Sequence, residues 1–223
     1  MPRITRRSLI RSIISQVVDR FTDAVGVKTY VLYMEDYGGP VGFRLAVAHP
    51  DRVRGIVIQN TVAHDDGLGA PWAARWAFWA DRPANEAAFR ASFLSLAATQ
   101  KRHLGSSPHP ENIDPDLWTD EFAFLSKPGE GDIQTDLFYH YKTNVDAFPA
   151  WQDYLKKYQP PLLVVWGKYD PSFDVAEAKA YSREVPKADV HVIEAGHFAL
   201  DEKADEVAGL VGTFLSKSKD GSK

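Results

Sequence analysis

The sequence of 223 residues contains no cysteine. This absence excludes disulfides, thiolate metal sites and a thiol nucleophile, and it leaves the redox compartment open. Neither sign of charge dominates, because 26 basic and 30 acidic residues give a formal net charge of −4 at pH 7. Such a balance provides no electrostatic footprint for nucleic acid, and no apolar run approaches the length of a membrane span. We therefore expect a cytoplasmic protein that binds neither nucleic acid nor membrane.

The first residues are basic and lead into a helical pattern. Residues 1–11 hold four arginines, and no acidic residue precedes Asp19, a composition that an organelle-targeting segment would also have. The segment lacks a clear cleavage region, so we favour the start of an amphipathic helix over residues 8–24. Its apolar residues recur at helical spacing and are expected to face the core: Ile10, Ile13, Ile14, Val17, Val18 and Phe21.

The chain is organised around residues 30–42. A short apolar strand at 30–34 runs into a glycine turn and then into a helix with Pro40 in its first turn. Gly38 is expected to let the backbone reverse without a side-chain clash. A sharp strand-to-helix turn presents its turn residue, here Asp36, as a nucleophile, and a carboxylate that attacks carbon leaves an ester on the enzyme. A plain surface turn is the alternative interpretation.

The rest of the chain predicts an α/β fold with a mostly parallel sheet, helices on both faces and a helical insertion. Apolar runs that read as strands recur after the first one, and a stretch of aromatic, helix-length segments separates them into two groups. The predicted later strands are 55–60, 161–167 and 189–194, with helices at 175–183 and 204–215. The predicted domains are an N-terminal core segment (1–60), an insertion (61–158), a C-terminal core segment (159–216) and a disordered tail (217–223).

Three polar residues each follow a predicted strand. Asp36, Asp170 and His197 would lie at the carboxyl ends of parallel strands, where such sheets bind their ligands. Taken singly, Asp170 could start a turn or helix, and His197 could be a satisfied, partly buried histidine. Their order along the chain, nucleophile, acid and histidine, is the order that α/β-hydrolases use.

The motifs around these residues resemble the α/β-hydrolase superfamily, specifically its branch with an aspartate nucleophile, the epoxide hydrolases and haloalkane dehalogenases. The resemblance covers nearly everything from 27 to 214. It rests on the runs Asp36-Tyr37-Gly38-Gly39, Trp166-Gly167-Lys168-Tyr169-Asp170 and Ala195-Gly196-His197-Phe198.

The resemblance implies both a fold and a mechanism. The insertion would be a cap domain that roofs the active site. Asp36 would attack an electrophilic carbon, His197 would deprotonate the water that hydrolyses the ester, and Asp170 would orient the histidine. The backbone amide of Tyr37 would be one oxyanion donor. The substrate would be a small molecule, and no metal or organic cofactor is required.

The sequence departs from the family before the nucleophile. The family's His-Gly-x-Pro loop, which supplies the second oxyanion donor, is absent, and about half of the family's sheet precedes the elbow. We expect a chain without those N-terminal strands, so that strand 30–34 becomes an exposed edge able to pair with another chain. Losing an oxyanion donor costs roughly 10²- to 10³-fold in rate. A non-catalytic remnant is therefore the alternative to an active hydrolase.

The substrate class depends on aromatic residues. Dehalogenases commonly have a Trp after the nucleophile, where this chain has Tyr37. Epoxide hydrolases use cap tyrosines to protonate the epoxide oxygen, and Tyr139, Tyr141 and Tyr154 lie in the insertion, with simple packing as their alternative role. We favour epoxide opening, with dehalogenation as the second possibility.

Overall fold

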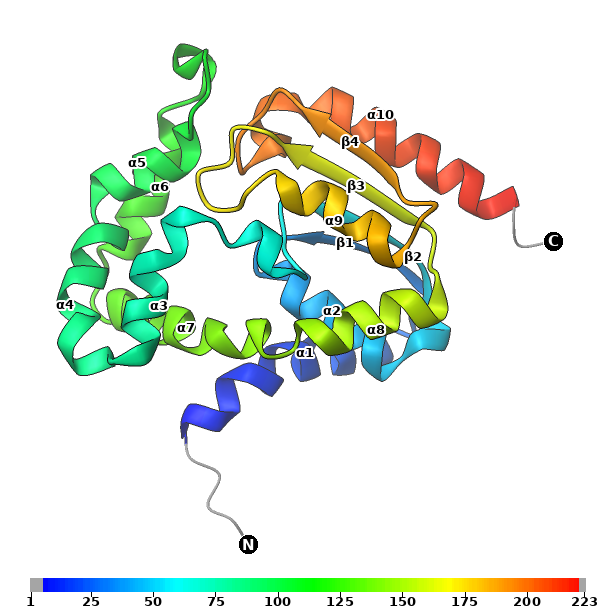
Figure 1. The fold of residues 1–223 in the computed structure, drawn as a ribbon, viewed down its shortest axis with the longest axis horizontal. Coiled ribbons are helices and arrows are strands. Elements are labelled where there is room, and N and C mark those ends of the chain that lie inside the picture. Colours follow the sequence, from blue (N-terminus) through cyan, green and yellow to red (C-terminus); the bar gives the residue numbers. More distant parts are fainter. Residues whose placement is uncertain (1–5, 221–223) are drawn as a thin grey trace, which may run out of the picture.

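The computed structural model describes residues 6–220, and side chains from 13 to 217. Within them, parallel strands form a sheet in the order β1-β2-β3-β4 (Figure 1). The α/β fold class is confirmed, and the predicted strands are confirmed to within two residues at each end. The strands are β1 (Tyr30–Glu35), β2 (Val53–Gln59), β3 (Leu162–Gly167) and β4 (Asp189–Ile193).

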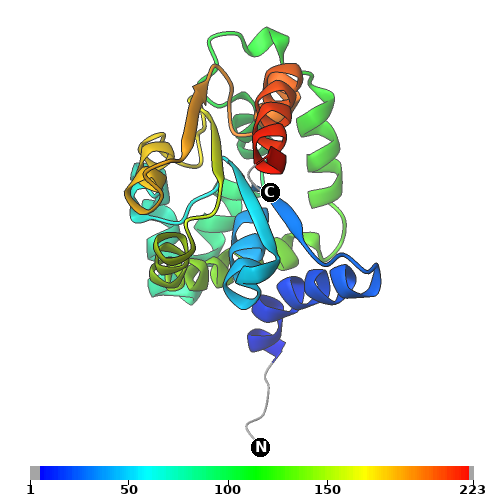
Figure 2. The same cartoon turned by 90° about the vertical axis from the view of Figure 1, so that its right-hand side faces the viewer.

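Helices cover both faces of the sheet (Figure 2). Because side chains alternate along a strand, Val57 and Leu163 pack with Phe214 of α10, whereas Ile58 and Val164 belong to the larger core on the other face. That larger core includes residues of α2, α8 and α9. These helices are α2 (Gly38–Ala48), α8 (Phe148–Tyr158), α9 (Ala176–Glu184) and α10 (Ala199–Asp220).

The region between β2 and β3 is helical, as predicted. Asp81 and Ser95 each accept a hydrogen bond from a backbone amide three residues later, which fixes the start of a helix. Large aromatic side chains fill the interior, with Trp72 and Trp151 each 1% exposed. The helices before α8 are α3 (Ala73–Ala80), α4 (Arg82–Phe93), α5 (Leu96–Leu104), α6 (Asp116–Leu125) and α7 (Glu130–Val145).

The prediction for the apolar side of α1 (Arg6–Ala24) is wrong for four of its six residues, whereas Val18 is half-buried. Val17 and Phe21 are 58% and 62% exposed, and Ile13 and Ile14 are also exposed. The polar side of the helix is the docked one, because Arg52 reaches residues on that side and the backbone that follows the helix. The contacts of Arg52 are Asp19 (3.3 Å), Thr22 (3.0 Å), Asp23 (3.0 Å), Val27 O (2.6 Å) and Lys28 O (3.2 Å).

The C-terminal helix is longer than the sequence predicted. The closing helix α10 starts at Ala199, bends at Lys203 and continues to Asp220, so it runs into residues 217–220 of the tail that was predicted to be disordered. Extending a helix that already exists costs little per residue, which outweighs the polar composition there. Residues 221–223 and the start of the basic segment, 1–5, lie outside the described residues, as does the side chain of Ile10.

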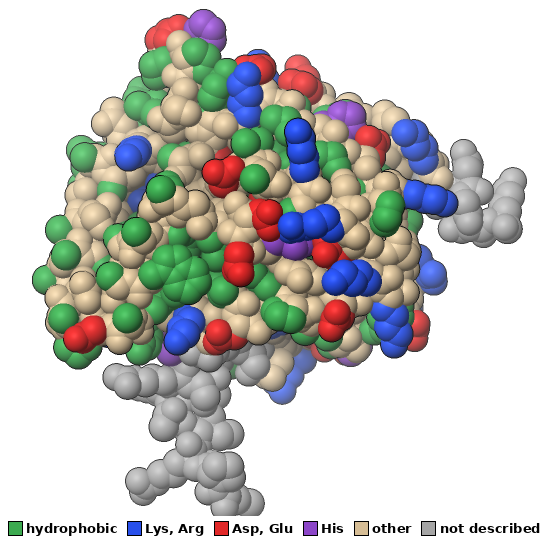
Figure 3. Space-filling view, in the orientation of Figure 1, with side chains coloured by type: hydrophobic (Ala, Val, Ile, Leu, Met, Phe, Trp, Pro, Cys, Tyr) green, Lys and Arg blue, Asp and Glu red, His purple; other side chains and the backbone are tan. Residues whose placement is uncertain are grey.

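The exposed edge of the sheet and the charges on the surface are the features that relate to possible binding partners. β1 pairs with β2 on one side and forms an edge of the described sheet, and Tyr33 is 40% exposed. Association of two chains through this edge stays a prediction. Acidic and basic side chains are interspersed on the face in Figure 3. None of the helices within 6–220 is long and apolar enough to cross a membrane.

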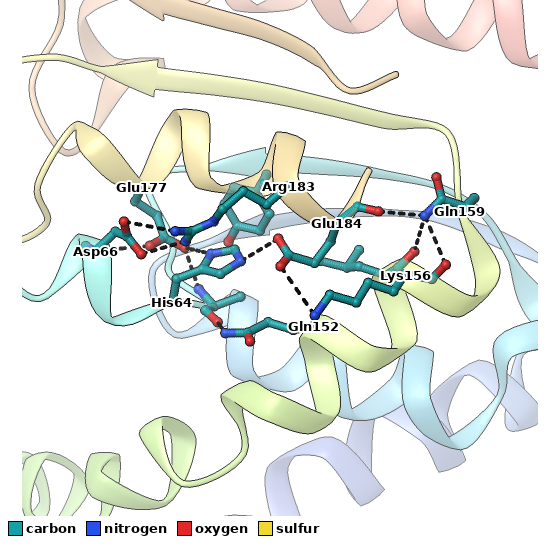
Figure 4. A network of polar contacts seen from close by, with 12 residues as sticks. His64, Asp66, Gln152, Lys156, Gln159, Glu177, Arg183 and Glu184 are labelled. Carbon is teal, nitrogen blue, oxygen red and sulfur yellow. Dashed lines mark hydrogen bonds and ion pairs between the residues drawn. The ribbon is translucent and has the colours of Figure 1, made fainter. Parts of the chain in front are cut away.

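A buried ion cluster joins α9 to the loop after β2 (Figure 4). Nδ1 of His64 lies 2.8 Å from Glu177 Oε1, and Nε2 lies 2.8 Å from Glu184 Oε2. With both carboxylates ionised, each can only accept, and both ring nitrogens then carry protons. Burial alone would lower the pKa of His64, but hydrogen bonds to Glu177 and Glu184 outweigh it and raise that pKa.

This cluster predicts a pH-dependent stability. The unfolded chain titrates His64 near 6.5, so the paired imidazolium stabilises the fold fully below that pH, and its contribution is lost as pH rises through the higher folded pKa. We expect Glu184→Gln to lower the free energy of unfolding by roughly 1–3 kcal/mol at pH 6, and by less at pH 9. Urea unfolding at both values measures this.

The matched control is Asp189→Asn, which removes the partner of the solvent-exposed His191. Exposed pairs are worth about 0–1 kcal/mol, so this variant should unfold nearly like the parent chain. A cost of Glu184→Gln that stays constant or grows between pH 6 and pH 9 would contradict an imidazolium at His64.

Candidate active site

The elbow after β1 holds Asp36 in a left-handed backbone conformation, with φ of 40°. Two donors fix its carbonyl oxygen: Thr61 Oγ1 at 2.7 Å and the amide of Gly39 at 3.0 Å. A side chain at Gly39 would place its Cβ 1.9 Å from Thr61 Oγ1, whereas one at Gly38 would meet nothing within 4 Å. A glycine is therefore required at position 39, where the loop after β2 approaches the turn. The sequence analysis assigned this requirement to Gly38, and that prediction is wrong.

Asp170 follows β3 and its side chain is 1% exposed. Its Oδ1 accepts backbone amides from Ser172 (2.6 Å) and Phe173 (3.1 Å), and its Oδ2 accepts the side-chain amide of Asn60 (2.8 Å). Asn60 follows β2 with φ of 42°, and it also accepts a hydrogen bond from the amide of Gly167 at 2.9 Å. The carboxylate is thus fixed by the ends of two neighbouring strands.

His197 follows β4 and links the two aspartates. Its Nδ1 lies 2.8 Å from Asp170 Oδ2, and its Nε2 lies 3.5 Å from Asp36 Oδ2. The residue is 2% exposed. Burial alone would lower the pKa of His197, but the carboxylates of Asp170 and Asp36 outweigh it and hold that pKa well above its usual range. The structure brings the three predicted site residues together at the carboxyl ends of β1, β3 and β4.

A further carboxylate lies at the same place. Glu35 Oε1 is 3.5 Å from His197 Nε2. Burial, opposed by the charge of His197 and assisted by Asp36 and Asp170, raises the pKa of Glu35 to about 7. The charge beside His197 therefore changes near neutral pH. Sequence reasoning missed Glu35, although it directly precedes the predicted nucleophile.

A cavity of about 30 Å³ connects Asp36 and His197 to the helical region. It adjoins a larger pocket of about 250 Å³ that also reaches Asp36 and Tyr37. Aromatic side chains from the sheet core and from the helical region between β2 and β3 line the smaller cavity, together with two arginines. The remaining lining residues are Trp72, Arg75, Phe93, Arg102, Phe138, Tyr141, Ser172 and Phe173.

The three candidate cap tyrosines fall in different places. Tyr141 is 2% exposed, lines the cavity, and its hydroxyl has no hydrogen-bond partner in the described structure. Tyr139 lies instead under Arg82 (4.9 Å) and beside Phe78 (5.5 Å). Tyr154 is buried next to Tyr158, with ring centres 5.1 Å apart. Of the three tyrosines, only Tyr141 lines the cavity with Asp36. The packing of the helices determines which tyrosine reaches the cavity, and the sequence alone does not reveal it.

Tyr37 contributes side chain as well as backbone. It precedes α2, and the first amides of a helix have no intrahelical acceptors, so its position suits an oxyanion donor. The residue lines the cavity, and its hydroxyl is buried without a partner among the described residues. Among the described side chains, no group of three or more acidic or histidine residues is arranged to hold a metal ion. The absence of a cofactor stays a prediction.

Comparison with known proteins identifies the family. Residues 11–204 match the model of the alpha/beta hydrolase fold family. The match covers most of the chain, which therefore belongs to this family. The chain is similar to an uncharacterised hydrolase of Saccharomyces cerevisiae, with 34% identity over 190 residues, covering 83% of the chain and 66% of that protein.

Two other similarities are more distant. Epoxide hydrolase 3 of Xenopus tropicalis is 26% identical over 208 residues, covering 86% of the chain and 54% of that protein. The solved 2-hydroxy-6-oxo-6-phenylhexa-2,4-dienoate hydrolase of Rhodococcus sp. strain RHA1 superposes with a TM-score of 0.72 at 16% identity, covering 96% of the chain and 74% of that structure. The latter shows the fold alone. The chain spans two thirds or less of the length of these two curated relatives.

The arrangement predicts that Glu35 affects the titration of His197. An ionised carboxylate 3.5 Å from Nε2 favours the imidazolium, so Glu35→Gln should lower the pKa of His197 by about one unit or more. Imidazole nitrogen shifts followed by NMR across the pH range measure this directly. The exposed Glu206→Gln on α10 is the control. An unchanged His197 titration in Glu35→Gln would show that the two groups are not coupled.

Proposed function

We propose that this α/β-fold hydrolase acts through Asp36 as a nucleophile and opens epoxides. The observation that carries the proposal is the 3.5 Å approach of Asp36 Oδ2 to His197 Nε2 in a cavity that Tyr141 also lines, with its buried hydroxyl lacking a partner among the described residues. The similarity to an epoxide hydrolase supports the same chemistry. Because the chain spans only a portion of its relatives, the activity of the whole protein is included in this proposal.

The first step is a displacement at an epoxide carbon. A carboxylate oxygen of Asp36 forms a bond to that carbon while the carbon–oxygen bond of the ring breaks. The released oxygen takes the proton of Tyr141, which becomes a phenolate until the proton is returned. Burial raises the pKa of Tyr141 well above its usual value, so the phenol keeps its proton until the ring oxygen develops charge.

The second step is hydrolysis of the ester, and the first step prepares it. Esterification removes the negative charge of Asp36, one of the two carboxylates that hold the pKa of His197 high. The imidazolium then loses its proton more readily, and the phenolate of Tyr141 can take it. This restores the phenol and leaves a neutral imidazole that can act as base. It deprotonates a water that attacks the ester carbonyl, while Asp170 keeps Nδ1 protonated and the ring oriented. The amide of Tyr37 would stabilise the oxyanion, and collapse releases a diol and Asp36.

Two other hypotheses make different predictions. A haloalkane would give the same ester with loss of halide and would not need Tyr141. A non-catalytic remnant would bind small molecules at most and would form no ester. In an enzyme with one oxyanion donor, ester formation would be retained and ester breakdown slowed.

The test is intact mass spectrometry of the His197→Gln variant, incubated separately with a terminal epoxide and a bromoalkane. Blocking the base should trap the ester on Asp36. We expect an adduct with the mass of the whole epoxide, abolished in Asp36→Ala/His197→Gln. An adduct of the alkyl group alone would favour dehalogenation. No adduct from either, on protein with the parent's circular dichroism spectrum, would reject the aspartate nucleophile.

A further inference from the structure

Arg75 of α3 is a half-buried cation that the proposed chemistry does not use. It lines the small cavity with Asp36 and His197. Its Nε is fully buried and has no hydrogen-bond partner among the described residues. A guanidinium stays protonated at any physiological pH, so the residues that line the cavity of Asp36 and His197 include a cation with an unused donor.

The surroundings of Arg75 are aromatic and do not neutralise it. The guanidinium carbon lies 4.4 Å from the ring centre of Trp72, with Phe138 at 5.6 Å and Phe93 at 5.9 Å. Its Nη1 donates to the carbonyl of Pro71 at 3.3 Å. Within the described residues of the chain, no carboxylate lies at ion-pair distance from it. Cation–π contacts orient the group but give it no ion-pair partner, and the carboxylate of Asp36 acts on it only from a distance.

The neighbouring arginine shows the contrast. Arg102 lines the same cavity, but it is paired with Glu121. Its remaining donors reach Phe93 O (2.9 Å) and Thr99 Oγ1 (3.1 Å). One cavity arginine therefore has its partners within the protein, and the other has an unused donor at the cavity.

Two more unpartnered donors accompany Arg75. Tyr37 and Tyr141, the latter also the proposed proton donor to the epoxide oxygen, line the same cavity, and their buried hydroxyls have no partner in the described structure. Burying a donor without an acceptor costs free energy, and more so for a charged one. A cationic donor beside two neutral ones favours an acceptor that is itself anionic. A carboxylate matches the planar fork of a guanidinium.

We propose that Arg75 binds a carboxylate of the substrate, so that the site takes small epoxy acids in which the carboxylate is adjacent to the reactive ring. This inference rests on the proposed Asp36 chemistry. An anionic substrate would otherwise be repelled by Asp36 and Asp170, and Arg75 supplies the compensating charge. The smallest member of the class, glycidate, places one carboxylate next to the epoxide, which suits the small cavity, with the larger pocket left for substituents.

The test compares glycidate with glycidamide, its neutral analogue, in the His197→Gln background. Intact mass spectrometry follows the rate at which each compound labels the protein. We expect glycidate to label faster, and Arg75→Gln to reduce its labelling rate roughly ten- to a hundredfold, as for loss of a charge-assisted hydrogen bond. Glycidamide labelling should change little. Arg75→Lys keeps the charge without the fork and should retain some of the preference.

A second measurement does not depend on the reaction. Acetate should quench tryptophan fluorescence of the unreacted chain saturably, because Trp72 lies under the guanidinium, and Arg75→Gln should abolish the effect. Chloride at the same ionic strength is the control for charge screening.

The outcomes separate the two proposals. Labelling by neither compound, with acetate bound through Arg75, would reject the Asp36 chemistry alone. Equal labelling by both compounds, unchanged by Arg75→Gln, would overturn the role of Arg75 and leave Asp36 as nucleophile. If Arg75→Gln does not fold, the role of Arg75 can still be tested in the His197→Gln background alone. The role is overturned if glycidamide labels this protein as fast as glycidate does and acetate gives no saturable quenching.

Discussion

The carboxylate of Asp170 is the fixed point of the site. It is almost fully buried and receives donors from the loop that follows it, from Asn60 and from His197. Asn60 also bonds to the backbone at the end of β3, so the same side chain ties the ends of β2 and β3 to each other and to the acid. Because every oxygen is satisfied, the carboxylate holds the imidazole in one orientation, with Nε2 toward Asp36.

Charge, more than shape, determines what this site can do. Asp36, Asp170 and Glu35 surround one imidazole, and the carboxylates of Asp170 and Asp36 keep its pKa high in the free protein. Esterification of Asp36 removes some of that field at the moment when a base is required. Arg75, which lines the same cavity, is the one described cation there without a carboxylate partner. The two proposals therefore describe a single charge balance, completed by an anionic substrate.

The features that depend on local sequence were predictable. The strands, their parallel direction and the positions of Asp36, Asp170 and His197 follow from apolar runs and the residues that end them. Contacts between side chains that are far apart in the sequence were not predictable. Arg52 turns the polar side of α1 inward, and the approach of Thr61 requires a glycine at position 39. Likewise, spacing on α7 cannot tell which tyrosine enters the cavity, and an arginine within a helix looks like a surface residue until its aromatic neighbours are seen.

The central claim is that water attacks the Asp36 ester and not the substrate carbon. A single turnover in heavy-oxygen water, with the protein in excess over an epoxide that labels His197→Gln, tests it directly. We expect that the peptide containing Asp36 gains one heavy oxygen and that the diol carries the light oxygen formerly on Asp36. Heavy oxygen in the diol with an unlabelled Asp36 peptide would mean direct attack by water, and would contradict the ester mechanism.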